Sequence, residues 1–246
     1  MTHQPDPQAR SRRLYGRRRG PALSARRKAL IRELLPRVEL SLDSPTVPGT
    51  DFAAATIDAG ALFKENMVDL WVEIGFGMGE HLAAQALAHP TIGFIGCEPY
   101  VNGIAGLLSL IDEGGMRNIR IYCDNALNLM EALPAASVGK IFLLHPDPWP
   151  KRRHQSRRFV SPGNIDIVAR VLRDGGEFRL QTDETGYVRW TMRCLEKRSD
   201  FKLLAEGPGG ARQRPGDRPR TRYEAKARLS GRTSHTLCFK RLPRLH

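Results

Sequence analysis

The stretch PDPWPKRRHQSRR at residues 146–158 combines residue types that could carry chemistry. Asp147 stands between Pro146 and Pro148, whose rings fix their own φ and restrict the residues before them. A carboxylate on so stiff a loop is positioned by the chain, rather than solvated at random. Trp149 offers either a face on which a flat ring can stack or an anchor that holds the loop.

The same stretch continues into a group of cations that suit phosphate groups. They are Lys151, Arg152, Arg153, Arg157 and Arg158. The stretch directly follows the apolar run 140–145, and in doubly wound sheets ligands lie beyond the carboxyl ends of the strands. We therefore expect this loop to face an acceptor substrate. The alternative is a structural loop with an exposed basic face.

A second motif, VEIGFGMGEHL at residues 72–82, is typical of a turn that receives a ligand. Gly75, Gly77 and Gly79 follow the pattern G-x-G-x-G where an apolar run gives way to a helical pattern. Glycine lets the backbone turn tightly and lets a ligand approach closely. Dinucleotide-binding turns have G-x-x-G after G-x-G, and Glu73 would repel a pyrophosphate. The turn therefore favours a ligand with an ammonium group and no phosphate.

Polar side chains also end the next two apolar runs. Glu98 can accept both hydroxyls of a ribose, and Asp124 or Asn125 can meet an adenine amino group. With Glu73 and the glycine turn, these residues predict S-adenosylmethionine as the cofactor, since it joins adenosine to a sulfonium and an amino acid. NAD is the rival, disfavoured by Glu73 and the glycine spacing. Taken singly, each position also fits a solvated strand end or a simple turn.

Apolar runs and helical patterns alternate along the chain, which predicts the elements that position these residues. Strands are expected at 70–74, 91–98, 118–123, 140–145, 176–183, 201–207 and 234–241, and helices at 24–35, 79–88, 101–113, 126–132, 162–172 and 184–196. Five β–α units in series predict an α/β fold with a doubly wound sheet, whose strands are covered on both faces. A closing antiparallel pair makes it a mostly parallel seven-stranded sheet.

The positive charge is concentrated in three segments, although the chain as a whole carries +13. Residues 1–30 carry a net +8, residues 151–158 carry +5, and residues 212–228 carry +5, so the remainder is mildly acidic. This pattern favours a polyanionic partner, with solubility as the alternative. We expect a basic, disordered N-terminal arm over 1–23 and a single domain over 24–246.

Several classes of site and location are disfavoured. The four cysteines form no CxxC pair, and His81 and His154 have no ligand partner at a fitting spacing, so no metal is expected. His81 is predicted on the surface of a helix. The sequence has no run of apolar residues long enough to span a membrane. A cytoplasmic enzyme is the prediction, although an Arg-rich start also fits a mitochondrial presequence.

The loop sequence resembles the signature PDPW-x-K-x-x-H-x-x-R-R of the tRNA (guanine-N7)-methyltransferases. The resemblance extends over most of the chain, through the glycine turn, the pair Thr182–Asp183 and the run Thr221–Glu224. It implies a Rossmann-like class I methyltransferase fold and S-adenosylmethionine-dependent methylation of guanine N7 in tRNA. In most members the methylated base is the variable-loop guanine, at position 46.

The resemblance also implies roles for individual residues. Cofactor contacts are implied at Glu73, Gly75, Gly77, Gly79, Glu98, Asn125 and Asp147, with Asp147 also the catalytic residue. Substrate contacts are implied at Lys151, Asp183, Thr221, Arg222, Tyr223 and Glu224. Many members have Asp at position 125, so either Asp124 or Asn125 is expected to face the adenine. Monomer and homodimer both stay open.

Two other functions fit parts of the sequence. Basic segments on a degenerate methyltransferase fold would give a non-catalytic RNA-binding protein, against which the acids at 73, 98, 147 and 183 argue. A small-molecule or protein methyltransferase would not need the clustered positive charge. Guanine N7 carries a lone pair and no proton, so the predicted reaction needs no base. We expect Asp147 to contact the guanine edge or the cofactor amine, not to shuttle a proton.

Overall fold

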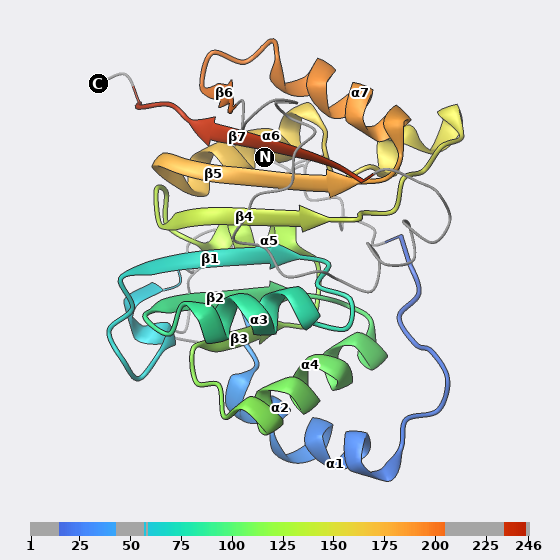
Figure 1. The fold of residues 1–246 in the computed structure, drawn as a ribbon, viewed down its shortest axis with the longest axis vertical. Coiled ribbons are helices and arrows are strands. Elements are labelled where there is room, and N and C mark those ends of the chain that lie inside the picture. The colour runs from blue at the N-terminus through green and yellow to red at the C-terminus, as the bar shows by residue number, and fades with distance from the viewer. Residues whose placement is uncertain (1–14, 43–56, 58, 205–233, 245–246) are drawn as a thin grey trace, which may run out of the picture.

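The structure is a computed structural model that describes residues 15–42, 57, 59–204 and 234–244. In this part of the chain, seven strands form one sheet in the order β3-β2-β1-β4-β5-β7-β6 (Figure 1). The strands are β1 (Asp69–Ile74), β2 (Ile92–Cys97), β3 (Ile119–Tyr122), β4 (Val138–Leu144), β5 (Leu172–Thr182), β6 (Phe201–Leu203) and β7 (His235–Arg241). Strands β1–β5 pair in parallel, and β7 is antiparallel to β5 and β6. The predicted sheet is confirmed.

Helices lie at the six predicted places, and three short ones that were not predicted add to them. They are α1 (Ala25–Glu33), α2 (Leu35–Val38), η2 (Ala59–Leu62), α3 (Glu80–Ala88), α4 (Val101–Gly114), α5 (Ala126–Ala132), η3 (Arg152–Arg157), α6 (Pro162–Val171) and α7 (Thr185–Leu195), of which α2, η2 and η3 are the short ones. Ser24 caps α1, as its side chain accepts a hydrogen bond from Arg27 N. The helical region continues past the predicted end at residue 35, because Pro36 falls in the first turn of α2, where no N–H is needed.

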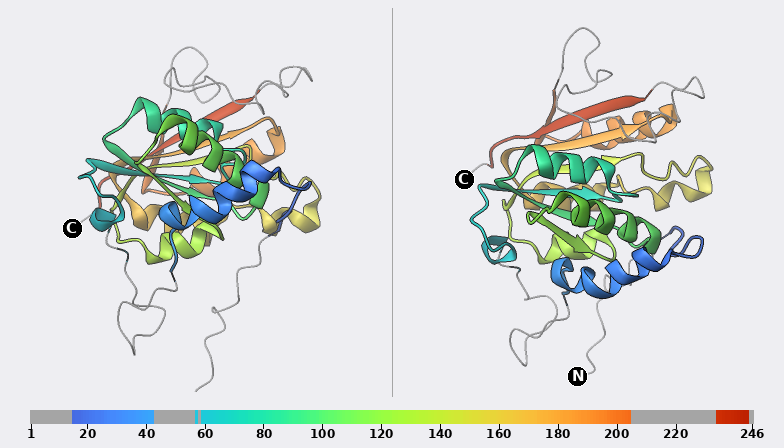
Figure 2. Two further views of the ribbon diagram at one scale, coloured as in Figure 1. Left: turned by 90° about the horizontal axis from the view of Figure 1, so that it is seen from below. Right: turned by 60° about the horizontal axis from the view of Figure 1, so that its bottom comes forward.

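The sheet separates two apolar cores, and this explains the continuous apolar runs of its strands. On β1, Trp71 packs with α3 and α4, while Val72 and Ile74 pack on the opposite face with α5 and α6. Figure 2 shows α3 and α4 on one side of the sheet and α5 on the other. Burial on both faces leaves the strand ends and their loops as the places for polar side chains.

The strand order reverses between β1 and β4, which are neighbours in the sheet. In such sheets the crevice for a ligand opens where the order reverses, beyond the carboxyl ends of the strands. Glu73 lies at this point, because it pairs with Gly96 of β2 on one side and with Phe142 of β4 on the other. The glycine turn after β1 and the Asp147 loop after β4 therefore flank the same crevice position.

Candidate active site

Three carboxylates meet at the carboxyl edge of the sheet. Glu73 is the last but one residue of β1, Glu98 follows β2 directly, and Asp147 lies three residues beyond β4. The charges of Asp147 and Glu73 both act on the carboxyl of Glu98. Because β2, β1 and β4 are neighbours in the sheet, their carboxyl ends bring these three predicted site residues to the same edge.

The glycine turn between β1 and α3 is built by left-handed backbone that glycine adopts without strain. Gly75, Gly77 and Gly79 have φ of 68°, 58° and 85°. The N–H of Gly77 donates to Glu98 Oε2 at 2.8 Å, and Tyr100 N donates to Glu98 Oε1 at 3.0 Å. Glu98 therefore ties the turn to the end of β2. A Cβ at Gly75 would meet no atom within 4 Å, so the backbone there is open to a ligand.

Burial governs the protonation of two of the three acids. Loss of water raises the pKa of Glu98, its two backbone hydrogen bonds lower it, and the charges of Asp147 and Glu73 raise it further. Asp147 as a whole is exposed, yet the atoms packed around its carboxyl raise its pKa by desolvation. Both carboxylates therefore gain from a cation placed between them, because it offsets the lost hydration.

Glu73 is buried and bonded to a histidine, which corrects the sequence prediction for His81. The Nδ1 of His81 lies 2.6 Å from Glu73 Oε2, and both side chains are at most 3% exposed. His81 therefore does not lie on the helix surface. The signal was available in the sequence: the helix 80–88 carries a single charged residue, Glu80, and such a helix is buried on more than one face.

At the end of β3, Asn125 and Asp124 have different partners. The side-chain oxygen of Asn125 accepts a hydrogen bond from Leu127 N at 3.0 Å and caps α5. Asp124 is half exposed and forms an ion pair with Arg18 at 3.5 Å. Which of the two faces an adenine stays a prediction, but only Asn125 is fixed by the helix it caps.

The Asp147 loop is held in strained backbone. His145 and Trp149 have φ of 49° and 42°, in the left-handed region that residues other than glycine rarely adopt. Such conformations cost about 1–3 kcal/mol each and persist only where surrounding contacts fix them. His145 N donates to Gln181 O of β5 at 2.7 Å, which fixes the start of the loop.

Arg158, which the sequence predicts as a phosphate ligand, also fixes the other end of the loop. Its side chain is buried, and its Nε donates to Pro148 O at 2.9 Å while Nη2 donates to Trp149 O at 3.3 Å. The guanidinium also lies 5.3 Å from the ring centroids of Tyr187 and Trp190. Sequence reasoning missed this role because both rings come from α7, about thirty residues further along the chain.

The remaining predicted substrate residues are only partly described. Lys151 is exposed on the loop, and Asp183 follows the end of β5, so both lie at the same edge as Asp147. Arg157 stacks near the rings of Tyr15 and Trp149, at 4.7 and 5.0 Å from their centroids. The run Thr221, Arg222, Tyr223 and Glu224 lies outside the described residues.

Residues 15–23 run along this edge, although the sequence predicts disorder over 1–23. Val101 N donates to Arg18 O at 3.0 Å, Gly20 N donates to Asn102 Oδ1 at 2.9 Å, and the ring of Tyr15 meets that of Trp149 at 6.1 Å. Figure 1 shows this segment on the side where β1, β2 and β4 end. Residues 1–14 lie outside the described residues. Composition carried no sign of these contacts.

The described part of the chain shows neither a metal site nor a membrane-spanning helix. Within it, no three His, Cys, Asp or Glu side chains are grouped as a metal site would require. None of its helices is both long and apolar enough to cross a membrane. What the edge offers instead is an open glycine turn, buried acids that favour a cation, and an adjacent loop with basic and aromatic side chains.

Comparisons with known proteins define the class. Residues 68–237 match the family described as "Putative methyltransferase". The 16S rRNA methyltransferase KamB has a similar structure, with a TM-score of 0.54 and 16% identity over 72% of this chain and 89% of that one. The aminoglycoside resistance methyltransferase NpmB1 gives 0.50 and 13%, over 72% and 88%. These two likenesses show the fold alone: that of methyltransferases.

Closer relatives define the family. The tRNA (guanine-N(7)-)-methyltransferase of Rhodospirillum rubrum is 43% identical over 240 residues, which cover 98% of this chain and 92% of the relative. That of Zymomonas mobilis subsp. mobilis is 46% identical over 220 residues, covering 89% and 90%. The chain belongs to the tRNA (guanine-N7)-methyltransferase family.

Proposed function

We propose that this protein transfers a methyl group from S-adenosylmethionine to N7 of a guanine in tRNA, and that the guanine is the one in the variable loop. The observation that carries the proposal is the combination of family and site. Relatives with this named activity align over nearly the whole chain, and the family's loop signature stands beside the acids that favour a cationic ligand.

The residues around the glycine turn fit this cofactor. Gly75 leaves open space for a ligand to approach the backbone, and the acids next to it include Glu73 and Glu98. We assign Glu73 to the ammonium group, Glu98 to the ribose hydroxyls, and Asn125 or Asp124 to the adenine. When bound, S-adenosylmethionine supplies an electrophilic methyl group on a sulfonium. A phosphate-bearing dinucleotide would instead be repelled by the negative charge of these carboxylates.

The protein's contribution to the reaction is placement and charge. Guanine N7 has a free lone pair, so no residue needs to remove a proton before methyl transfer. Holding N7 in line with the methyl carbon can contribute several kcal/mol. Asp147, on its braced loop, is positioned to accept a hydrogen bond from the guanine edge or to orient the cofactor amine. The purine becomes positive during the reaction, and a nearby carboxylate stabilises that charge.

We assign substrate binding to the basic and polar groups around Asp147. We assign Lys151 to the tRNA backbone and Asp183 to the guanine edge. Thr221, Arg222, Tyr223 and Glu224 are assigned to tRNA by the family resemblance alone. The backbone contact at Lys151 places the nucleic acid and does not by itself read its sequence.

Deletion of the gene tests the proposed target. Sequencing of tRNA from the deletion strain should show that 7-methylguanosine is lost from the variable loop and restored by the wild-type gene. Complementation with Asp147→Asn should fail, whereas Asp112→Asn, an exposed acid on α4, should restore the modification. Loss of a different modification, or full complementation by Asp147→Asn, would contradict the proposal.

A further inference from the structure

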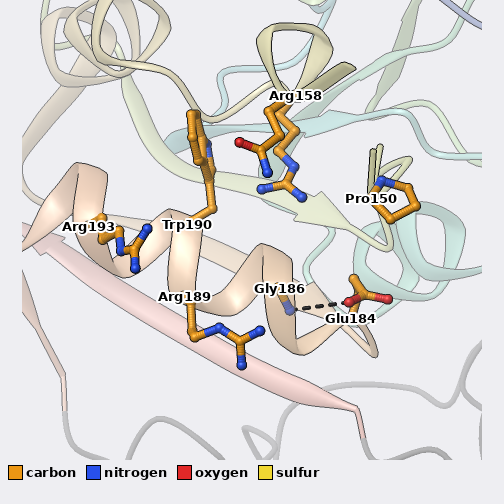
Figure 3. A pocket seen from close by; sticks show the side chains of 8 residues that line it. Pro150, Arg158, Glu184, Gly186, Arg189, Trp190 and Arg193 are labelled. Carbon is orange, nitrogen blue, oxygen red and sulfur yellow. Dashed lines mark hydrogen bonds between the residues drawn. The ribbon is translucent and has the colours of Figure 1, made fainter. Parts of the chain in front are cut away.

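A pocket of about 300 Å³ opens between the end of the Asp147 loop and helix α7. Figure 3 shows its lining, with Arg158 and Pro150 on the loop side and the α7 side chains opposite. The lining residues are Pro150, Gln155, Arg158, Glu184, Gly186, Arg189, Trp190 and Arg193. None of the residues assigned above to the cofactor lines this pocket, and neither Lys151 nor Asp183 does. The pocket is therefore a separate site on the surface.

The pocket carries excess positive charge. Arg189 and Arg193 are four residues apart on α7 and therefore share one face of the helix. Both are exposed, and neither side chain forms a hydrogen bond or ion pair with another residue in the described ranges. The one carboxylate in the lining, Glu184, accepts a hydrogen bond from Gly186 N at 3.2 Å. Three guanidinium groups thus face one carboxylate.

The chemistry of the lining points to a phosphodiester. Guanidinium groups bind phosphate oxygens through paired, charge-assisted hydrogen bonds. Two arginines at one opening repel each other, and a bound anion relieves that repulsion. The volume accommodates a phosphate with part of its sugar. The pocket also adjoins Pro150, three residues from Asp147, to which the contact with the target base is assigned above.

We propose that this pocket binds a backbone phosphate of the tRNA strand next to the methylated guanine, with Arg189 and Arg193 as its ligands. The inference rests on the proposed function. Arg158 connects the pocket to the chemistry, since its guanidinium lines the pocket and also donates to the carbonyl groups of Pro148 and Trp149. A phosphate in the pocket therefore adds an anionic partner for the same group that braces the Asp147 loop.

The double variant Arg189→Gln/Arg193→Gln tests the pocket in the full-length protein. Its charge-matched control is Arg32→Gln/Arg37→Gln, at the α1–α2 end of the molecule, far from α7 (Figure 1). Affinity for unmodified tRNA is measured from about 50 to 200 mM salt. The pocket variant should bind tRNA at least about tenfold more weakly, with a slope of log Kd against log salt lower by about one to two. Its affinity for S-adenosylmethionine and its melting temperature should stay at the wild-type values.

The outcomes separate this inference from the proposed function. Equal loss of tRNA affinity in the pocket and control variants would overturn the proposed phosphate site, because net charge alone would then explain the effect. An unchanged salt slope would also overturn it. Absence of 7-methylguanosine formation by the wild-type protein would instead refute the proposed function, whatever the binding data show.

Discussion

Gly103 of α4 packs against the glycine turn. Its replacement by alanine tests whether this close contact keeps the turn in the conformation that binds the cofactor. A Cβ at position 103 would lie well under 3.0 Å from the carbonyl oxygen of Gly77, and 3.3 Å from Cγ of Glu98. Both neighbours belong to the turn and its anchor. Since α4 is packed on the core, the turn must move by about 1 Å to restore an ordinary contact.

Such a movement removes the hydrogen bond from Gly77 N to Glu98, now 2.8 Å long. A hydrogen bond to a charged group contributes about 1.5–3 kcal/mol, and the better helix propensity of alanine returns about 1 kcal/mol. The free energy of unfolding should therefore fall by about 0.5–2 kcal/mol. The dissociation constant for S-adenosylmethionine should rise by at least about tenfold, because the turn and Glu98 both shift.

Calorimetric titration with S-adenosylmethionine and thermal unfolding measure the two effects. Gly163→Ala is the matched control, since a Cβ there would meet no atom within 4 Å and Gly163 also lies in a helix, α6. That variant should bind normally and be slightly more stable. Wild-type affinity in Gly103→Ala, at a normal melting temperature, would refute the claim that this turn holds the cofactor.

Three further predictions follow from the same contacts. Because the pKa values of Glu98 and Asp147 are raised, cofactor affinity should fall as pH drops through a window that begins above their ordinary values of about 4; a flat calorimetric profile from pH 7 to 4.5 would contradict this. Arg158→Lys should lower kcat on tRNA about tenfold or more with an unchanged cofactor Kd, and wild-type kcat would show that the brace is dispensable. His81→Leu leaves the buried Glu73 carboxylate unpaired and should lower the free energy of unfolding by about 2 kcal/mol in urea titrations, where an unchanged midpoint would count against the pair.

The sequence predicted the sheet well, because apolar runs and helical patterns alternate without interruption and parallel strands need both faces covered. The carboxyl edge was equally predictable, since Glu73, Glu98 and Asp147 each stand at a strand end and the topology brings those ends together. These inferences depend on local pattern and on one rule of sheet topology. Their residue-level roles toward cofactor and tRNA stay predictions.

What the sequence could not provide was the choice of partners across the fold. Arg158 belongs to a run of cations, and such a run is usually solvated, yet rings from α7 and two loop carbonyl groups bury it. The sequence places Arg18 in a polar N-terminal segment, yet its carbonyl group accepts a hydrogen bond from Val101 N and so caps the start of α4. In both cases the partner lies tens of residues away, and only the tertiary packing selects it.

The most direct test of the whole account is incubation of the purified protein with S-adenosylmethionine and unmodified tRNA, followed by nucleoside analysis. The wild-type protein should form 7-methylguanosine, the Asp147→Asn variant should not, and the Asp112→Asn variant should retain the activity. A wild-type protein that binds both ligands yet forms no 7-methylguanosine, or that methylates another atom, would contradict the account.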